Sequence, residues 1–260
     1  MPKLIITADD CGLTEAINQK TCELHQRGYV NAASVMTNYP AHQHALALFR
    51  TCPDLDLGIH LSLTDGHPVS DDEAHHPHLL NEDFSFRNNL SLYLRSHFFR
   101  SDAVAWIRNE LDAQLRRFTD AGLQPQHIST HHHFHSIPLL RRIVHELAAK
   151  YAVDWVRAHD FRASVSPHNF FLRRQRQAGN DAFNMPDYVM AIQACMKLSV
   201  EDFCARITRL SGIVEIVVHP APRHDPDFPA DWHYGIAPRR AETQFLIQAV
   251  DRLRELGLSI

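Results

Sequence analysis

Short apolar runs alternate with amphipathic segments along nearly the whole chain. The apolar runs have the length of buried strands and lie at Leu4–Ala8, Val30–Met36, Leu55–Leu63, His127–His133, Asp154–Ala158 and Ile213–His219. Segments with apolar residues at helical spacing lie at residues 14–27, Ala41–Arg50, Asp102–Ala121, Pro138–Lys150, Val200–Leu210 and Arg239–Leu256. Thr14 and Gly28 are typical start and stop residues for the first helix. Leu258–Ile260 is expected to begin a last strand.

This alternation of strands and helices predicts an α/β fold with a parallel sheet, either open or closed into a barrel. The chain has 260 residues, a usual length for one α/β barrel. No linker, repeat or low-complexity tract divides the sequence, so residues 1–260 are expected to form a single domain. Thr64–Phe99 and Pro220–Pro238 are predicted to be long polar loops, and Ser164–Tyr188 a loop with some helix.

Groups with catalytic chemistry follow or end four of the predicted strands. Asp9 and Asp10 come directly after the first strand, and His60 lies in the third. A histidine string ends the fourth strand (His131, His132, His133 and His135), and His219 ends the strand before Pro220. In α/β barrels the catalytic groups collect at the carboxyl ends of the strands. We therefore expect these side chains to lie close together.

Each of these features also has a structural interpretation. Asp9 or Asp10 could cap a helix or form a turn with Gly12, and a single histidine such as His60 is more often a core residue than a ligand. The histidine string is the sharpest signal, because it lies in the middle of the chain, between a strand and a helix. On an extended chain His131, His133 and His135 would share one face, although the sequence does not say which of them acts.

Composition excludes several other classes of protein. The formal net charge is −4 and no Lys/Arg run is present, so nucleic-acid binding is not expected. Five scattered cysteines without a CxxC pair argue against a disulfide scaffold and favour a reducing compartment. No signal peptide and no membrane span is predicted, and a soluble, cytoplasmic protein is expected.

Four segments together resemble the YdjC-like carbohydrate deacetylase family, which includes chito-oligosaccharide deacetylases and a hopanoid-biosynthesis branch. The matching segments are Thr7-Ala8-Asp9-Asp10-Cys11-Gly12-Leu13, Gly58-Ile59-His60-Leu61, the stretch from His127 to His135, and Val218-His219-Pro220. The resemblance implies a distorted, TIM-like (β/α) barrel. It also implies that Asp10, His60 and His131 bind a divalent metal, that Asp9 is the general base and His219 the general acid, and that Arg157 orients the base.

Two residues depart from the family's usual pattern. Cys11 stands where an aromatic residue is common, and Ser129 stands where the family commonly has Asp or Asn. Loss of that Asp or Asn would weaken the support of a metal ligand if the side chain normally holds it. Neither departure removes a proposed ligand.

The expected reaction is hydrolysis of the N-acetyl group of an N-acetylglucosamine-containing sugar, either a chito-oligosaccharide or a glycolipid-linked sugar. Two imidazoles and a carboxylate favour Zn²⁺, with Mn²⁺ and Co²⁺ as further candidates, whereas the resemblance favours Mg²⁺. The resemblance leaves a homodimer open. Alternatives are another barrel metallohydrolase, or a non-catalytic protein that binds metal or sugar on the same fold. We also expect an aromatic residue of the two long loops to contact the sugar, from Phe84, Phe86, Trp232 or Tyr234.

Overall fold

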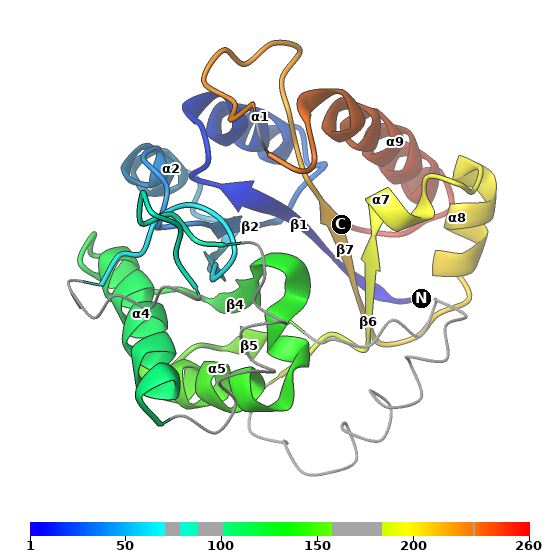
Figure 1. Cartoon of the computed structure of the whole chain (residues 1–260). Coiled ribbons are helices and arrows are strands. Elements are labelled where there is room, and N and C mark those ends of the chain that lie inside the picture. The colour runs from blue at the N-terminus through cyan, green and yellow to red at the C-terminus, as the bar shows by residue number, and fades with distance from the viewer. Residues whose placement is uncertain (71–78, 88–100, 158–183, 231) are drawn as a thin grey trace.

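A curled sheet of seven strands forms the centre of the molecule. The computed structural model describes residues 1–70, 79–87, 101–157, 184–230 and 232–260. All neighbouring strands are parallel, in the order β5-β4-β3-β2-β1-β7-β6. Helices pack around the outside of the sheet, which curls into a half-barrel (Figure 1). The predicted α/β class and distorted barrel are therefore confirmed.

The order of elements follows the predicted alternation. The strands are β1 Lys3–Cys11, β2 Ala32–Val35, β3 Asp56–Leu61, β4 His127–Thr130, β5 Trp155–Val156, β6 Tyr188–Ala191 and β7 Ile213–Val218. The helices are α1 Glu15–Gln26, α2 His42–Phe49, α4 Ser101–Thr119, α5 Pro138–Lys150, α7 Ile192–Cys195, α8 Val200–Ile207 and α9 Ile236–Glu255, with a 3₁₀ turn η1 at His131–Ser136. Among the described helices, none combines the length and apolar character that crossing a membrane requires.

The structure corrects the sequence-based elements in three places. Leu258–Ile260 forms no strand, and Leu258 instead packs its buried side chain into the core. The fourth strand ends at Thr130, because the chain turns into η1 at the histidine string. Strand β6 and helix α7 were not predicted, and most of the expected loop Ser164–Tyr188 lies outside the described residues. Thr14 caps α1 as predicted, since its side chain accepts a hydrogen bond from the Ile17 amide.

The two faces of the sheet have different chemistry. In β1, Leu4, Ile6 and Ala8 belong to the apolar core, and alternate residues of a strand point to opposite faces. Thr7 and Asp9 therefore point to the other face, where they meet charged partners from other strands. The outer face stabilises the fold by burying apolar surface against helices, and the inner face carries polar groups.

Gly58 in β3 makes room on this inner face for the ring of His127 in β4. A Cβ atom at position 58 would lie 2.4 Å from that ring. His127 is fully buried and held by two hydrogen-bonding contacts, at 2.8 Å from the Ser34 hydroxyl and 2.6 Å from an Asp56 carboxylate oxygen. The ring consequently has little freedom to move away from an added methyl group.

We therefore expect Gly58→Ala to lower the free energy of unfolding by about 1–3 kcal/mol, the usual cost of overpacking a buried site. Urea-induced unfolding followed by circular dichroism measures the change. Gly235→Ala is the control, because a Cβ there meets no heavy atom within 4 Å. Equal effects of the two substitutions would show that the contact with His127 is not the cause.

Candidate active site

The inner face of the sheet brings the six predicted site residues to one end of the strands. Asp9 and Asp10 end β1, and the other four come from β3, from η1 and from the residues that follow β5 and β7 (His60, His131, Arg157 and His219). Five of the six are no more than 4% exposed, and His219 is also largely enclosed. The geometry thus agrees with the expectation that these groups lie together.

A β-bulge lets both adjacent carboxylates face the same site. In β1, Ala8 pairs with Ala33 and Cys11 with Val35, so Asp9 and Asp10 together oppose a single residue of β2. Asp10 has a left-handed backbone, with φ of 62°. In a regular strand the two side chains would point to opposite faces, and the bulge turns that of Asp10 back to the inner face.

Arg157 joins Asp9 to a second buried carboxylate. Its Nη1 and Nη2 donate to the two oxygens of Asp9 at 2.6 and 2.9 Å, and its Nε and Nη2 donate to Oε1 of Glu215 at 2.9 and 2.8 Å. Burial alone would raise the pKa of Asp9, but the charge of Arg157 outweighs it and holds that pKa well below its usual range. Asp9 is therefore ionised and fixed in orientation.

Asp10 lies at the meeting point of three potential metal ligands. Its Oδ2 is paired with Arg239, and its Oδ1 lies 3.3 Å from both Nε2 of His60 and Nδ1 of His131. Within the described part of the chain, Oδ1 accepts no hydrogen bond of good geometry. One ligand atom from each of Asp10, His60 and His131 lies within 4.8 Å of the other two. Such a buried, convergent set fits one divalent ion, whose bonds to nitrogen and oxygen are about 2.0–2.2 Å long.

The two histidines of this set differ in protonation. Burial lowers the pKa of His60 below its ordinary value, although Asp9 and Asp10 oppose the shift. For His131 the balance is reversed: burial would lower its pKa, but the carboxylates of Asp10 and Asp65 raise it to about 9. A metal ion would therefore displace a proton from His131 at neutral pH, because only the neutral ring can bind it.

A series of hydrogen-bonding contacts begins at Nδ1 of His60 and orients its ring. Its Nδ1 lies 2.7 Å from the hydroxyl of Ser129, which donates to Ser34 at 2.9 Å, and Ser34 in turn contacts His127. The series ends on Asp56. Partners of this kind set the tautomer and orientation of a ligand, and their loss typically costs about 10–100-fold in metal affinity or activity. Ser129 thus supports His60 directly, and replacing the family's Asp or Asn does not leave His60 without a partner.

His219 is paired with a glutamate of helix α9. Its Nδ1 lies 3.2 Å from both carboxylate oxygens of Glu242, and its backbone amide donates to the same carboxylate at 2.8 Å. Burial would lower the pKa of His219, but the Glu242 carboxylate raises it above the ordinary value. The Glu242 carboxylate thus favours the protonated ring, which is the form that a general acid requires.

The histidine string is not extended, so the predicted alternation of its side chains is wrong. His132 and His133 have left-handed backbones, with φ of 52° and 51°. The rings of His131 and His132 stack with centroids 4.2 Å apart, whereas His135 turns back to contact Thr130. Sequence periodicity could not show this, because a local turn overrides the strand pattern.

Apart from Arg157, the charged partners of the site were not found from sequence. Glu215 carried the clearest signal, since it is a glutamate inside the apolar strand Ile-Val-Glu-Ile-Val-Val. Arg239 and Glu242 look like ordinary exposed residues of an amphipathic helix, yet both are fully buried. Asp65 follows β3 in a polar loop whose sequence shows no motif or periodicity that would single it out.

Burial separates structural from accessible side chains among Cys11, which replaces the family's usual aromatic residue, and the aromatic residues of the two long loops. Cys11 is buried, and burial raises the pKa of its thiol to about 12, so it is no nucleophile. Phe86 and Trp232 are buried at 4% and 7% exposure and act as anchors for their loops. Tyr234 is half-buried and Phe84 is exposed. Of the four aromatic candidates for sugar contact, these last two have the accessible surface.

A family model, proteins of known name and a solved structure are all similar to this chain. A family model described as YdjC-like protein matches residues 3–256. A carbohydrate deacetylase of Brevibacillus brevis is 40% identical over 58% of this chain and 57% of its own length, and one of Vibrio cholerae is 30% identical over 84% and 78%. The chain thus matches less than two thirds of the first of these relatives. A crystal structure from Enterococcus faecalis, described as a candidate cellobiose-phosphate cleavage protein, has a TM-score of 0.79 at 28% identity, covering 100% of this chain and 96% of that one.

The buried pairing of Arg157 predicts a large effect on stability. Arg157→Met leaves Asp9 and Glu215 without their cation, and breaking a buried ion pair costs about 3–5 kcal/mol. Thermal and urea unfolding measure the loss. Arg108→Met is the matched control: Arg108 pairs with Glu146 on the surface, where such a pair contributes about 0–1 kcal/mol. If both variants lost the same small amount of stability, the buried pairing would not stabilise this fold.

Proposed function

The chain belongs to the family of YdjC-like proteins, and from that premise we propose that it is a metal-dependent carbohydrate deacetylase. In the proposed reaction, water hydrolyses the N-acetyl group of an N-acetylglucosamine-containing sugar to acetate and a free amine. The observation that carries the proposal is the convergence of His60 and His131 on a buried oxygen of Asp10, with Asp9 beside them.

The proposed metal ligands are Asp10, His60 and His131. A divalent ion held there would lower the pKa of a water toward about 7 and polarise the acetyl carbonyl. The donor set of two imidazoles and one carboxylate favours Zn²⁺, while Mg²⁺, Mn²⁺ and Co²⁺ remain candidates to be tested. Arg239 holds the second oxygen of Asp10 and so directs the first oxygen toward the two imidazoles.

Asp9 is the proposed general base. Its Oδ1 lies 3.8 Å from Nδ1 of His60, so it stands beside the ligand set without being part of it. Arg157 keeps Asp9 ionised but also makes it a weak base. The metal would therefore have to acidify the water strongly before Asp9 could accept its proton, because a general base works best with a pKa near the working pH.

His219 is the proposed general acid. As the new carbon–oxygen bond forms and the carbon–nitrogen bond breaks, the leaving nitrogen needs a proton. A protonated His219, stabilised by Glu242, would supply it. Arg157 and Glu242 act through Asp9 and His219 and are positioning residues.

Relatives support a carbohydrate as the substrate. Two of them are named carbohydrate deacetylases, and the description of the structural neighbour refers to a phosphorylated disaccharide. We propose a chito-oligosaccharide or a glycolipid-linked sugar of the same chemistry. The single domain over residues 1–260, a homodimer and a cytoplasmic location stay predictions.

Acetate release tests the proposed reaction. Metal-stripped protein is given N,N′-diacetylchitobiose and related N-acetylglucosamine compounds, with Zn²⁺, Mg²⁺, Mn²⁺ or Co²⁺ added back. We expect metal-dependent acetate and a loss of about 10²–10⁴-fold in Asp9→Asn, because the variant has no general base. Asp227→Asn, at an exposed position, is the control. Tight metal binding without acetate from any sugar would instead favour a non-catalytic metal- or sugar-binding protein.

The pH profile tests the acid. Activity requires protonated His219 and falls as pH rises through the pKa of that ring. Glu242 raises this pKa, so Glu242→Gln should move the falling limb of the kcat/KM profile to lower pH. Glu255→Gln, exposed on the same helix, should leave the limb in place. An unmoved limb in Glu242→Gln would remove His219 from the role.

A further inference from the structure

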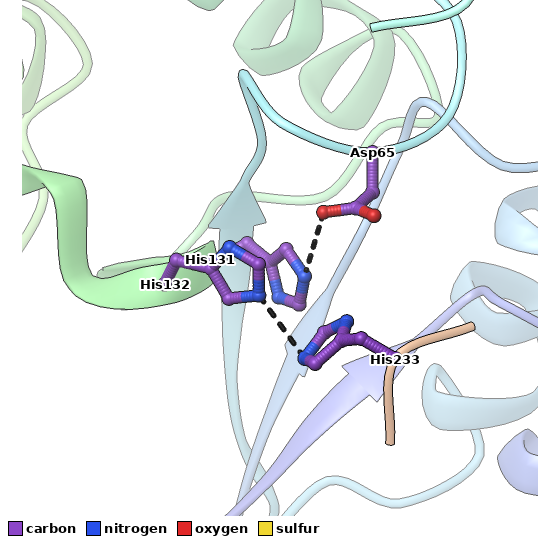
Figure 2. Close-up of side chains that lie close together, drawn as sticks. All are labelled: Asp65, His131, His132 and His233. Atoms are coloured by element: carbon purple, nitrogen blue, oxygen red, sulfur yellow. Dashed lines mark hydrogen bonds and ion pairs between the residues drawn. The ribbon is translucent and has the colours of Figure 1, made fainter. Parts of the chain in front are cut away.

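A second group of ligand-type side chains lies at the outer edge of the site. Figure 2 shows Asp65, from the loop after β3, facing His131, while His132 of η1 faces His233 of the loop before α9. One ligand atom from each of these four residues lies within 4.8 Å of all the others. His132 and His233 are exposed, whereas the inner ligand set is buried.

The atoms of this group approach at distances typical of neighbouring metal ligands. Oδ2 of Asp65 lies 3.2 Å from Nε2 of His131, and Nε2 of His132 lies 3.1 Å from Nε2 of His233. A tetrahedral ion with bonds of about 2.0–2.2 Å would hold its ligand atoms roughly that far apart. Oδ2 of Asp65 and Nε2 of His131 are buried, and neither makes a hydrogen bond of good geometry within the described part of the chain.

The local backbone is arranged to present these rings. The left-handed conformation of His132 stacks its ring on that of His131 and brings its Nε2 to His233. His233 is in turn stacked on Trp232, which is anchored in a small apolar cluster. Non-glycine residues with positive φ persist where the surroundings hold them, and they are concentrated at functional sites.

The chemical types of these side chains also suit a metal. Two exposed imidazoles and one carboxylate are ligands that divalent ions of the zinc class accept.

We propose that Asp65, His132 and His233 form a second divalent-metal site, separate from the inner site of Asp10, His60 and His131. Its two imidazoles and one carboxylate select metals of the Zn²⁺, Co²⁺ and Ni²⁺ class over Mg²⁺ and leave coordination positions open to solvent or substrate. His131 lies between the two sites, with Nδ1 toward Asp10 and Nε2 toward Asp65. A cation at the outer site would draw Asp65 away from His131 and repel a second cation inside.

One consequence rests on the proposed deacetylase function. Since the outer site lies beside a shared histidine, its occupation should inhibit turnover at high Zn²⁺. The binding of metal itself does not depend on any reaction, so the two claims are tested by separate measurements.

Equilibrium dialysis of the whole metal-stripped chain against Zn²⁺, and the visible absorption of added Co²⁺, count and characterise the sites. We expect the unaltered protein to bind two equivalents of Zn²⁺. The equivalent bound at the outer site should be lost in His233→Asn and in Asp65→Asn and retained in His224→Asn. His224 is an exposed histidine of the same loop and serves as the matched control. Asp10→Asn should lose the inner equivalent and keep the outer one.

The outcomes are distinguishable. If His233→Asn and Asp65→Asn bind as much metal as the unaltered protein, the outer site does not exist. If only the equivalent removed by Asp10→Asn is ever found, the outer site is again excluded while the inner one stands. Acetate release supplies the second readout: excess Zn²⁺ should inhibit the unaltered protein and His224→Asn, and that inhibition should be absent from His233→Asn. Inhibition that persists in His233→Asn would refute the regulatory consequence even if the outer site binds metal.

Discussion

Two adjacent carboxylates buried at the end of β1 set the requirement that the rest of the structure satisfies. Asp9 and Asp10 are each 1% exposed, and a buried unpaired charge costs several kcal/mol. Their cations come from far away in the chain, Arg157 from 148 positions and Arg239 from 229 positions later. The sheet must therefore bring β1 beside the residues that follow β5 and beside α9 before either carboxylate is stabilised.

The inner face of the half-barrel consequently behaves as a polar core. Two arginines face three carboxylates there, Asp9, Asp10 and Glu215, so one carboxylate charge is left without an arginine. The protonated ring of His131 balances that charge, and the proposed metal would take over this role by displacing the proton. Stability comes from the other face, where apolar side chains pack against helices. The separation lets the site carry charge without weakening the apolar core.

His131 connects the two groups of ligands in one electrostatic system. Carboxylates lie on both sides of its ring, and together they favour its protonated form. A metal in the inner site would replace that proton, and a metal in the outer site would add a positive charge beside the ring, so an ion in one site would change the electrostatics of the other. The same ring thereby links the buried chemistry proposed at Asp10 with the exposed histidines at the edge of the site.

The order of strands and helices, apart from β6 and α7, was determined by the sequence, because periods of two and 3.6 residues are local properties that a buried face imposes on the chain. The strand-end positions of Asp9, Asp10, His60 and His219 followed for the same reason. Only the tertiary structure decided which charges meet. Arg239 and Glu242 resemble solvated helix residues until α9 packs at the site, and Glu215 gains a meaning only when Arg157 lies beside it.

Local backbone geometry determined which way the side chains of Asp10 and His132 point. The bulge at Asp10 and the left-handed turn at His132 reverse the faces that simple alternation assigns. A strand pattern carries no information on such a reversal, since it depends on whether the surrounding contacts compensate for the strain of a positive φ. The residues of the proposed inner site were thus readable from the chain, whereas their partners and the outer cluster of Asp65, His132 and His233 were decided by packing between segments distant in sequence.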